Sequence, residues 1–516
     1  MSTTIAPPAA EAAPQAKPAA ASRRGGWIDD WDPEDEAFWE HRGRKVAKKN
    51  LALSIFAENL GFSIWVLWTI VVINLANAGF ELSLSEQFLL IALPNLVGST
   101  LRIPYTFAVP RFGGRKWTGI SASLLLIPVL ALSIVVPSGW LADQAHGTQM
   151  WVLALCAATA GFGGGNFSSS MANISFFYPD RHKGAALGLN AAGGNLGVAV
   201  AQLVVPLVII AGVPAAAVKL PVHEVNLAYA GLIWLPFIVV AALGAWLFMD
   251  SISDARTDAR SYTKSLKHGQ TWVMSLLYIG TFGSFIGYAF ALPLVVKNTF
   301  PEFLAGHPFI ATYLAGLGFV GALIGSVARP LGGWLSDKVG GARVTLVVFL
   351  GEALLTITAI VGVNEHSFPL FFGSFMLIFL LAGAGNGSTY RMIPCIFSAL
   401  GRKEAAEKGL DPKTTALDFK HQAAAVIGIA GAIGAFGGFL IQVSFRQASL
   451  GVSAAVRAAE TPAERLSVAQ SMADWSISAL YVFLVAYVVF AGMTWFFYLR
   501  TSFATDKVPS LAHAAV

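Results

Sequence analysis

Long apolar runs separated by short polar loops dominate this chain. About twelve segments hold roughly 20 or more mostly apolar residues, which is enough for a helix to cross a bilayer. They do not alternate between apolar and polar residues as the strands of a membrane barrel do. The pattern therefore predicts an all-α integral membrane protein with twelve transmembrane helices, near residues 51–78, 84–108, 117–137, 150–178, 184–212, 226–249, 271–296, 309–334, 343–363, 367–399, 420–445 and 475–499.

Composition and charge agree with this class. Apolar residues make up 55% of the 516 residues, charged residues 12%, and the mean hydropathy is +0.64. Most lysines and arginines fall in alternate loops, which predicts that both termini are cytoplasmic in the inner (cytoplasmic) membrane. Because the basic residues are spread over many loops, the net charge of +5 reflects topology, and we expect no nucleic-acid partner.

A polar, charged loop near the middle of the chain separates six predicted helices from six. The sequence therefore divides into a cytoplasmic N-terminal arm, partly disordered, a first six-helix bundle, a cytoplasmic linker, a second six-helix bundle and a cytoplasmic tail. These parts cover residues 1–50, 51–249, 250–270, 271–499 and 500–516.

Two arginines lie within apolar segments at matching places of an internal repeat. Arg102 follows Gly98-Ser99, and Arg329 follows Gly325-Ser326, 227 positions later, with a Gly-Gly pair downstream of each. A guanidinium stays charged in a protein, and a charge in hydrocarbon is costly. Such a pair on a pseudo-symmetry axis predicts a binding site for an anion.

Further pairs support an internal duplication. Gly163-x-Gly165-Asn166 recurs 220 positions later as Gly383-x-Gly385-Asn386. In the fifth and eleventh predicted helices, three glycines and one glutamine recur at an offset of 240, namely Gly188/Gly428, Gly194/Gly434, Gly197/Gly437 and Gln202/Gln442. Two pseudo-symmetric six-helix halves predict a central cavity that opens alternately to the two sides of the membrane.

Two further intramembrane charges suggest a gate. Glu58 and Arg391 lie at similar depth near the cytoplasmic side, so an ion pair between them is a hypothesis, and Glu58 is also the residue most able to couple transport to protons. No phosphate-binding loop, Ser/His/Asp arrangement or metal-ligand spacing is present, so the sequence predicts neither an enzyme nor a cofactor or metal. An anion channel remains a rival class.

Two motifs connect the chain to known families. The segment Gly332-Gly-Trp-Leu-Ser-Asp337-Lys-Val-Gly-Gly-Ala-Arg343 resembles the cytoplasmic loop of the major facilitator superfamily. Between about residues 27 and 500 the chain further resembles the nitrate/nitrite porter family. The strongest matches are the glycine-rich stretches at 184–197 and 423–438, the stretches at 166–177 and 276–287, and the arm from Trp31 to Trp39.

The resemblance implies a major facilitator fold and a substrate site. In it, Arg102 and Arg329 would clamp a nitrate or nitrite ion from opposite halves. Phe167 and Phe282 would stack on the flat faces of the ion, and Tyr278 and Asn195 would donate hydrogen bonds. Glycines would let the helices pack closely and slide during gating, and those concerned are Gly188, Gly193, Gly194, Gly197, Gly428, Gly431, Gly434 and Gly437.

The coupling of transport is the open alternative. Moving an anion into a negative-inside cell is uphill by about 2.3 kcal/mol per 100 mV. The positive charge of an empty site would discourage the return of the unloaded site across the membrane, which favours exchange of nitrate for nitrite. We expect the protein to act as a monomer in the bilayer. A proton-coupled nitrate symporter and a transporter of another small oxyanion remain as alternatives, and nitrate assimilation is an expected physiological context.

Overall fold

The computed structural model describes residues 27–210, 225–255, 259–502 and 510–512. Residues 1–22, for which the sequence predicts disorder, are outside the described residues, and so is most of the tail beyond Arg500. Twelve of the described helices are long and apolar enough to cross a membrane, as the apolar pattern predicts. They span Glu36–Asn74, Leu84–Thr106, Gly114–Val135, His146–Phe177, Asp180–Ile209, Ala228–Phe248, Gly269–Thr299, Ala315–Val339, Gly341–Asn364, Phe368–Lys408, Pro412–Ala448 and Ala473–Tyr498.

Several of these spans consist of shorter helical pieces joined without a loop. The pieces are α1 (Glu36–Phe38), η1 (Trp39–Gly43), α2 (Arg44–Val66) and α3 (Trp68–Asn74) in the first span, α6 (Gly114–Leu124) and α7 (Leu126–Val135) in the third, α9 (His146–Thr159), α10 (Gly161–Gly165) and α11 (Phe167–Phe177) in the fourth, α13 (Ala228–Leu232) and α14 (Leu235–Phe248) in the sixth, and α16 (Gly269–Tyr278), η4 (Ile279–Gly283) and α17 (Ser284–Thr299) in the seventh. The eighth span consists of η5 (Ala315–Leu317) and α20 (Gly318–Val339), and the twelfth of η6 (Ala473–Ser476) and α26 (Ile477–Tyr498). The other spans are single helices: α4 (Leu84–Thr106), α12 (Asp180–Ile209), α21 (Gly341–Asn364), α22 (Phe368–Lys408) and α23 (Pro412–Ala448).

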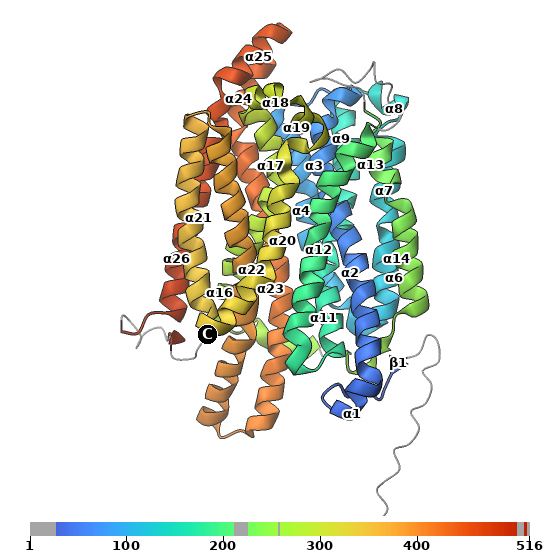
Figure 1. The fold of residues 1–516 in the computed structure, drawn as a ribbon, viewed down its shortest axis with the longest axis vertical. Coiled ribbons are helices and arrows are strands. Elements are labelled where there is room, and N and C mark those ends of the chain that lie inside the picture. The colour runs from blue at the N-terminus through green and yellow to red at the C-terminus, as the bar shows by residue number, and fades with distance from the viewer. Residues whose placement is uncertain (1–26, 211–224, 256–258, 503–509, 513–516) are drawn as a thin grey trace, which may run out of the picture.

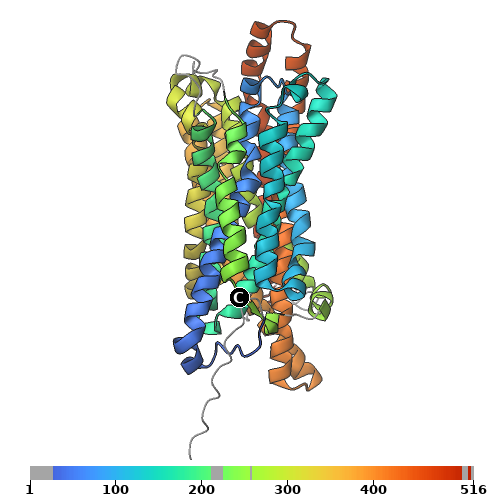
Figure 2. The same cartoon turned by 90° about the vertical axis from the view of Figure 1, so that its right-hand side faces the viewer.

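The helices form two groups that lie side by side. In Figure 1 the blue-to-green helices of the first half occupy the right of the molecule and the yellow-to-red helices of the second half occupy the left, and Figure 2 shows the same bundle from the side. The halves meet where α4 packs against α23 and α12 packs against α20. The N-terminal arm and the end of α26 lie at the same end of the bundle (Figure 1), which we call the arm end.

The repeated Gly-Gly pairs have the same structural role in both halves. Gly113 ends α5 (Ala108–Phe112) with φ 81°, and Gly340 ends α20 with φ 94°. Only glycine adopts this region of φ readily, so each glycine allows the chain to turn and begin the next helix one residue later.

The N-terminal arm folds over the arm end of the first half. Its β1 strand (Trp27–Ile28) pairs in parallel with β2 (Ser251–Ile252), the segment that follows α14. The indole of Trp31 donates a hydrogen bond to the carbonyl of Phe176, and Glu34 accepts one from the backbone of Asp180. The arm is therefore connected to the loop between α11 and α12 and to the start of the linker between the halves.

The helix ends differ from the predicted ones where polar helix formers follow apolar residues. The helix α22 runs to Lys408, nine residues beyond the predicted end, and α23 begins at Pro412, eight residues before the predicted start. The added turns form a helical hairpin below the bundle in Figure 1. Conversely, the eighth span begins later than predicted, because Pro308–Tyr313 forms a separate helix, α19, and the chain turns sharply at Gly316.

Candidate functional site

The two repeat arginines lie deep inside the bundle, between the halves. Arg102 is on α4 and Arg329 is on α20, and their exposed fractions are 0% and 3%. The guanidinium carbon of each approaches the ring of Phe167, at 4.9 Å for Arg102 and 5.3 Å for Arg329. The structure therefore brings together two residues that are 227 positions apart in the sequence.

The two predicted phenylalanines form the apolar part of the site. Phe167 begins α11, and Phe282 lies in η4, a π-helical turn that interrupts the seventh span, a feature frequent at functional sites. Their rings stack with centroids 5.8 Å apart and an interplanar angle of 18°. Arg102 and Arg329 also lie within 4.8 and 6.0 Å of the Phe282 ring. Both cations thus rest on the same pair of aromatic rings, a favourable cation–π arrangement.

The rings of Phe167 and Phe282 are too close together to hold an ion between them. A planar ion held between two aromatic faces needs about 3.5 Å on each side, or about 7 Å between the rings. The observed centroid distance of 5.8 Å is shorter than this. Phe167 and Phe282 therefore have to separate by about 1 Å or more before they can hold a planar ion between them.

The hydrogen bonds of the two arginines differ. Arg102 donates through Nε to the carbonyl of Gly164, at 2.9 Å, and through Nη1 to the carbonyl of Gly431 in the other half, at 2.7 Å. Arg329 donates through Nη2 to the hydroxyl of Tyr278, at 3.2 Å. One terminal nitrogen of each, Nη2 of Arg102 and Nη1 of Arg329, is buried and has no hydrogen-bond partner. Buried charged donors without a partner are costly, so the pair is suited to an anion that accepts from both.

Tyr278 lies beside Arg329 and Phe282, and two further aromatic residues lie against the arginines. The Tyr278 ring stacks on Phe282 at 5.4 Å and 6°. Tyr390 places its ring 5.1 Å from the Arg329 guanidinium, and its buried hydroxyl has no partner. Trp65 lies 5.3 Å from the Arg102 guanidinium. Sequence reasoning missed both, because the repeat mate of Tyr390 at the 220 offset is Ser170 and because tryptophan is common in apolar helices.

Asn195 is buried in α12 and makes no side-chain hydrogen bond to the arginines or to Tyr278. Its exposed fraction is 0%, and neither the amide nitrogen nor the amide oxygen has a hydrogen-bond partner. An unsatisfied buried carboxamide is costly. Asn195 therefore has free hydrogen-bonding capacity, and its role toward a ligand stays a prediction.

Most of the predicted packing glycines lie at close helix contacts. A Cβ at Gly197 would meet the Asn59 carbonyl at 2.1 Å, and one at Gly434 would meet the Tyr278 ring at 2.3 Å. A Cβ at Gly193, Gly194, Gly428, Gly431 or Gly437 would have neighbours at 2.5–3.3 Å. Gly188 is the exception, because a Cβ there meets nothing within 4 Å. Its predicted packing role is not seen in this structure, since this part of α12 faces open space.

The hypothesis of an ion pair between Glu58 and Arg391 is wrong for this structure. Arg391 on α22 pairs instead with Asp337 at the end of α20, with 2.7 Å between Nε and Oδ1. The helices α20 and α22 pack side by side, which brings these two residues together. Glu58 is buried on α2, where its Oε2 accepts a hydrogen bond from Asn166 and its Oε1 has no partner. Similar depth and opposite charge were insufficient to identify the partner.

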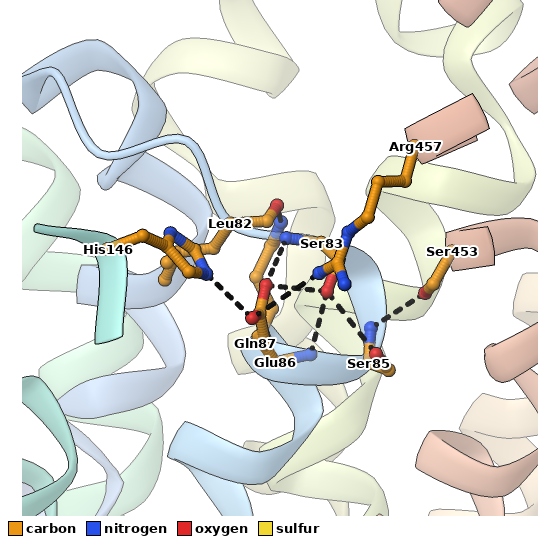
Figure 3. Close-up of polar contacts among 8 residues, drawn as sticks. All are labelled: Leu82, Ser83, Ser85, Glu86, Gln87, His146, Ser453 and Arg457. Carbon is orange, nitrogen blue, oxygen red and sulfur yellow. Dashed lines mark hydrogen bonds and ion pairs between the residues drawn. The ribbon is translucent and has the colours of Figure 1, made fainter. Parts of the chain in front are cut away.

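A second polar network joins the halves at the end opposite the arm (Figure 3). Glu86 and Ser83 form a capping box at the start of α4, and the Glu86 carboxylate also contacts His146 at 2.8 Å and Arg457 at 3.5 Å. Ser453 of α24 (Leu450–Ala458) accepts a hydrogen bond from the backbone of Ser85 at 3.0 Å. At the arm end, Lys420 of the second half pairs with Asp180 of the first at 2.6 Å. Contacts between the halves therefore exist at both ends and at the centre.

Comparisons with known proteins agree with this architecture. A sequence model of the Major Facilitator Superfamily matches residues 51–442. The nitrate/nitrite transporter NarU of Escherichia coli (strain K12) is 37% identical over 489 residues, which cover 92% of this chain and 97% of that protein. The probable nitrate/nitrite antiporter NarK2 of Thermus thermophilus is 37% identical over 435 residues, 81% of this chain and 89% of that protein.

Solved structures resemble the chain in fold. A D-xylose–proton symporter superposes with a TM-score of 0.58 and 14% identity, covering 87% of this chain and 97% of that one. A bacterial homologue of the human lysosomal transporter Spinster gives a TM-score of 0.55 with 16% identity, covering 86% and 95%. At these identities the likeness concerns the fold alone.

Proposed function

This chain belongs to the Major Facilitator Superfamily, and we propose that it carries nitrate and nitrite across the cytoplasmic membrane by alternating access, exchanging one for the other. It is a multi-pass membrane transporter rather than an enzyme, as its relatives and its fold indicate. We further propose that it works as a monomer with both termini in the cytoplasm, with residues 51–249 and 271–499 moving as two bundles.

One observation carries the proposed substrate. Two buried guanidinium groups share one pair of aromatic rings, and each retains a terminal nitrogen without a partner. Nitrate is planar and monovalent, so parallel N–H···O bonds from a guanidinium match it as they match a carboxylate. Weak hydration of the ion suits the aromatic faces. The names of the relatives agree, since NarU and NarK2 are described as nitrate/nitrite transporters or antiporters.

The same observation supports exchange. Arg102 and Arg329 keep their charge in every state, so an empty site carries two buried cations through the return step. An anion bound during both crossings removes this cost. Exchange of one monovalent anion for another also moves no net charge, so the membrane potential does not oppose it.

Glu58 is the specific observation that favours a second candidate, proton-coupled nitrate uptake. It is a buried carboxyl group with one unpaired oxygen, and it interacts electrostatically with Arg102. A proton on this group would change the charge beside the site as the anion binds. In an exchanger, Glu58 would instead offset part of the charge of Arg102 without taking up a proton.

Proteoliposomes distinguish the two candidates. Nitrate uptake is measured with internal nitrite, with no internal anion, and with an inward pH gradient and no internal anion. We expect rapid uptake with internal nitrite alone, and the same dependence in Glu58→Gln. Uptake driven by the pH gradient and abolished in Glu58→Gln would establish proton coupling. Glu352→Gln is the matched control, because Glu352 is a second fully buried carboxyl group without a partner, on α21. Saturating exchange with nitrite but not with formate would exclude a general oxyanion carrier and a channel.

A further inference from the structure

A surface groove at the arm end lies between the first and fifth spans. It has a volume of about 670 Å³ and is lined by η1, α2, the loop before α12 and the first turns of α12. The helices α2 and α12 pack against each other along their length and face the viewer in Figure 1. The groove lies away from the buried arginines and does not include any residue of the candidate substrate site.

The inner part of the groove is apolar. Leu51, Ala52 and Ile55 line it from α2, and Ala185, Ala186 and Leu189 line it from α12. Leu51 and Ala186 are buried and form its floor, whereas Ala52 and Ala185 are exposed and Leu189 has an exposed fraction of 57%. An exposed apolar channel on the flank of a membrane-spanning helix pair fits a hydrocarbon chain.

The mouth of the groove is basic. Arg44 and Lys48 lie one turn apart on α2, and His182 lies opposite them on α12. Arg44 shares an exposed ion pair with Glu40, at 3.3 Å, while Lys48 has no ion-pair partner in the part of the chain that the structure describes. One acidic residue therefore faces two permanent cations, so the mouth has a positive charge that suits an anionic group.

Aromatic rings line the outer end of the groove, next to the basic mouth. The Trp39 ring stacks against the His182 ring at 6.0 Å and meets the Tyr178 ring edge-on at 5.6 Å. Tryptophan and tyrosine are enriched at the boundary between water and lipid. Lys48 and Ile55 share one face of α2 and are about 10 Å apart along the axis, so the groove passes from charge to hydrocarbon over the depth of a lipid headgroup region.

We propose that this groove binds one anionic phospholipid. Its phosphate lies at Arg44, Lys48 and His182, and one acyl chain lies along Ala52, Ile55 and Leu189. Basic pockets between transmembrane helices recognise anionic headgroups in this way. Ile55 also packs closely on Gly193 of α12, since a Cβ at Gly193 would lie 2.5 Å from the Ile55 side chain. The lipid would therefore lie against the tightly packed contact between α2 and α12.

Native mass spectrometry of the full-length protein in detergent tests the proposal. Phosphatidylglycerol and phosphatidylethanolamine with identical acyl chains are titrated separately, and inorganic phosphate is added as a competitor. We expect selective retention of phosphatidylglycerol and no competition by phosphate at equal concentration. At about 1 kcal/mol per basic residue near a membrane surface, Arg44→Ala with Lys48→Ala should weaken phosphatidylglycerol binding on the order of 25-fold.

The control and a second variant make each outcome decisive. Lys267→Ala with Lys413→Ala removes two exposed cations at the same end but outside the groove, and should leave lipid binding unchanged. Ala52→Trp fills the channel and keeps both cations, and it should also reduce binding. Equal retention of the two lipids, an equal loss in the Lys267/Lys413 control, or displacement by phosphate alone would overturn the proposal. Because the readout is bound lipid, failure here leaves the proposed transport function untouched.

Discussion

Arg102 and Arg329 occupy matching positions in the two halves, but the protein anchors them differently. Arg102 donates to two backbone carbonyls, at Gly164 in its own half and Gly431 in the other, and its guanidinium lies against three aromatic rings. The Arg329 guanidinium donates through Nη2 to the hydroxyl of Tyr278, and its Nη1 has no partner among the described residues. A sequence repeat can thus conserve the residue and its depth while the contacts around it diverge.

The difference has a consequence for alternating access. The bond from Arg102 to Gly431 crosses between the halves, so it must break when α4 and α23 separate. The bond from Arg329 to Tyr278 lies within the second half and can survive the same movement. We therefore infer that Arg102 contributes to both substrate binding and closure, and that Arg329 contributes mainly to binding.

Replacing each arginine by lysine should have the largest effect. Lysine keeps the charge but loses the planar fork, and a hydrogen bond to a charged group is worth about 1.5–3 kcal/mol, or roughly 10- to 150-fold in affinity. We expect Arg329→Lys to weaken nitrate binding within this range and Arg102→Lys to weaken it more, because the latter also loses its bonds to Gly164 and Gly431. Isothermal titration of nitrate into the purified protein measures both.

Arg402→Lys is the control for this pair, because Arg402 is an exposed arginine on the extension of α22. Its substitution should leave nitrate affinity unchanged. Near-normal affinity in Arg102→Lys and Arg329→Lys would contradict the clamp, and equal losses in the two would contradict the difference in anchoring.

Alanine at Gly434 should have the next largest effect. Its Cβ would lie 2.3 Å from the Tyr278 ring, which is confined by Phe282 and Tyr390, so the acceptor of Arg329 has to move. Overpacking of this kind typically costs about 1–3 kcal/mol. We expect Gly434→Ala to lower nitrate/nitrite exchange in proteoliposomes on the order of tenfold or more.

Gly188→Ala provides the matched control for Gly434→Ala, since both positions belong to the repeated glycines of α12 and α23. A Cβ at Gly188 meets open space, so exchange should remain normal. Normal exchange in Gly434→Ala would show that Tyr278 is not held in place by this contact.

The sequence predicted the parts of this protein that depend on pattern. Twelve apolar runs correspond to the twelve spanning helices, and the internal repeat pairs Arg102 with Arg329. The family resemblance added Phe167, Phe282 and Tyr278, which the structure places around the arginines. It also implied a hydrogen bond from Asn195 to the ion, and this contact remains a prediction.

The contacts that the sequence could not predict depend on packing geometry. Whether Arg391 meets Glu58 or Asp337 is decided by the crossing of α20 and α22, and whether Gly188 is packed depends on which face of α12 is covered. The bond from Arg102 to the Gly431 carbonyl involves the backbone, which leaves no residue type to recognise. Tyr390 was missed because its repeat mate, Ser170, is not aromatic, and Trp65 was missed because tryptophan is common in apolar helices.

The smallest effects are expected for Tyr278 and Tyr390, the two tyrosines that lie beside Arg329. Tyr278→Phe removes the acceptor of the Arg329 Nη2 hydrogen and should weaken nitrate binding by about tenfold, since one hydrogen bond to a charged group is lost. The Tyr390 hydroxyl has no partner, so Tyr390→Phe should leave thermal stability unchanged or raise it slightly. If that hydroxyl donates to the bound anion, Tyr390→Phe will nevertheless weaken nitrate binding, whereas unchanged affinity would limit Tyr390 to its cation–π contact with Arg329. Titration of nitrate together with thermal unfolding of both variants measures affinity and stability separately. An unchanged nitrate affinity in Tyr278→Phe would show that the hydrogen bond from Arg329 to Tyr278 does not contribute to binding. Arg102 would then differ from Arg329 even more than their hydrogen bonds indicate.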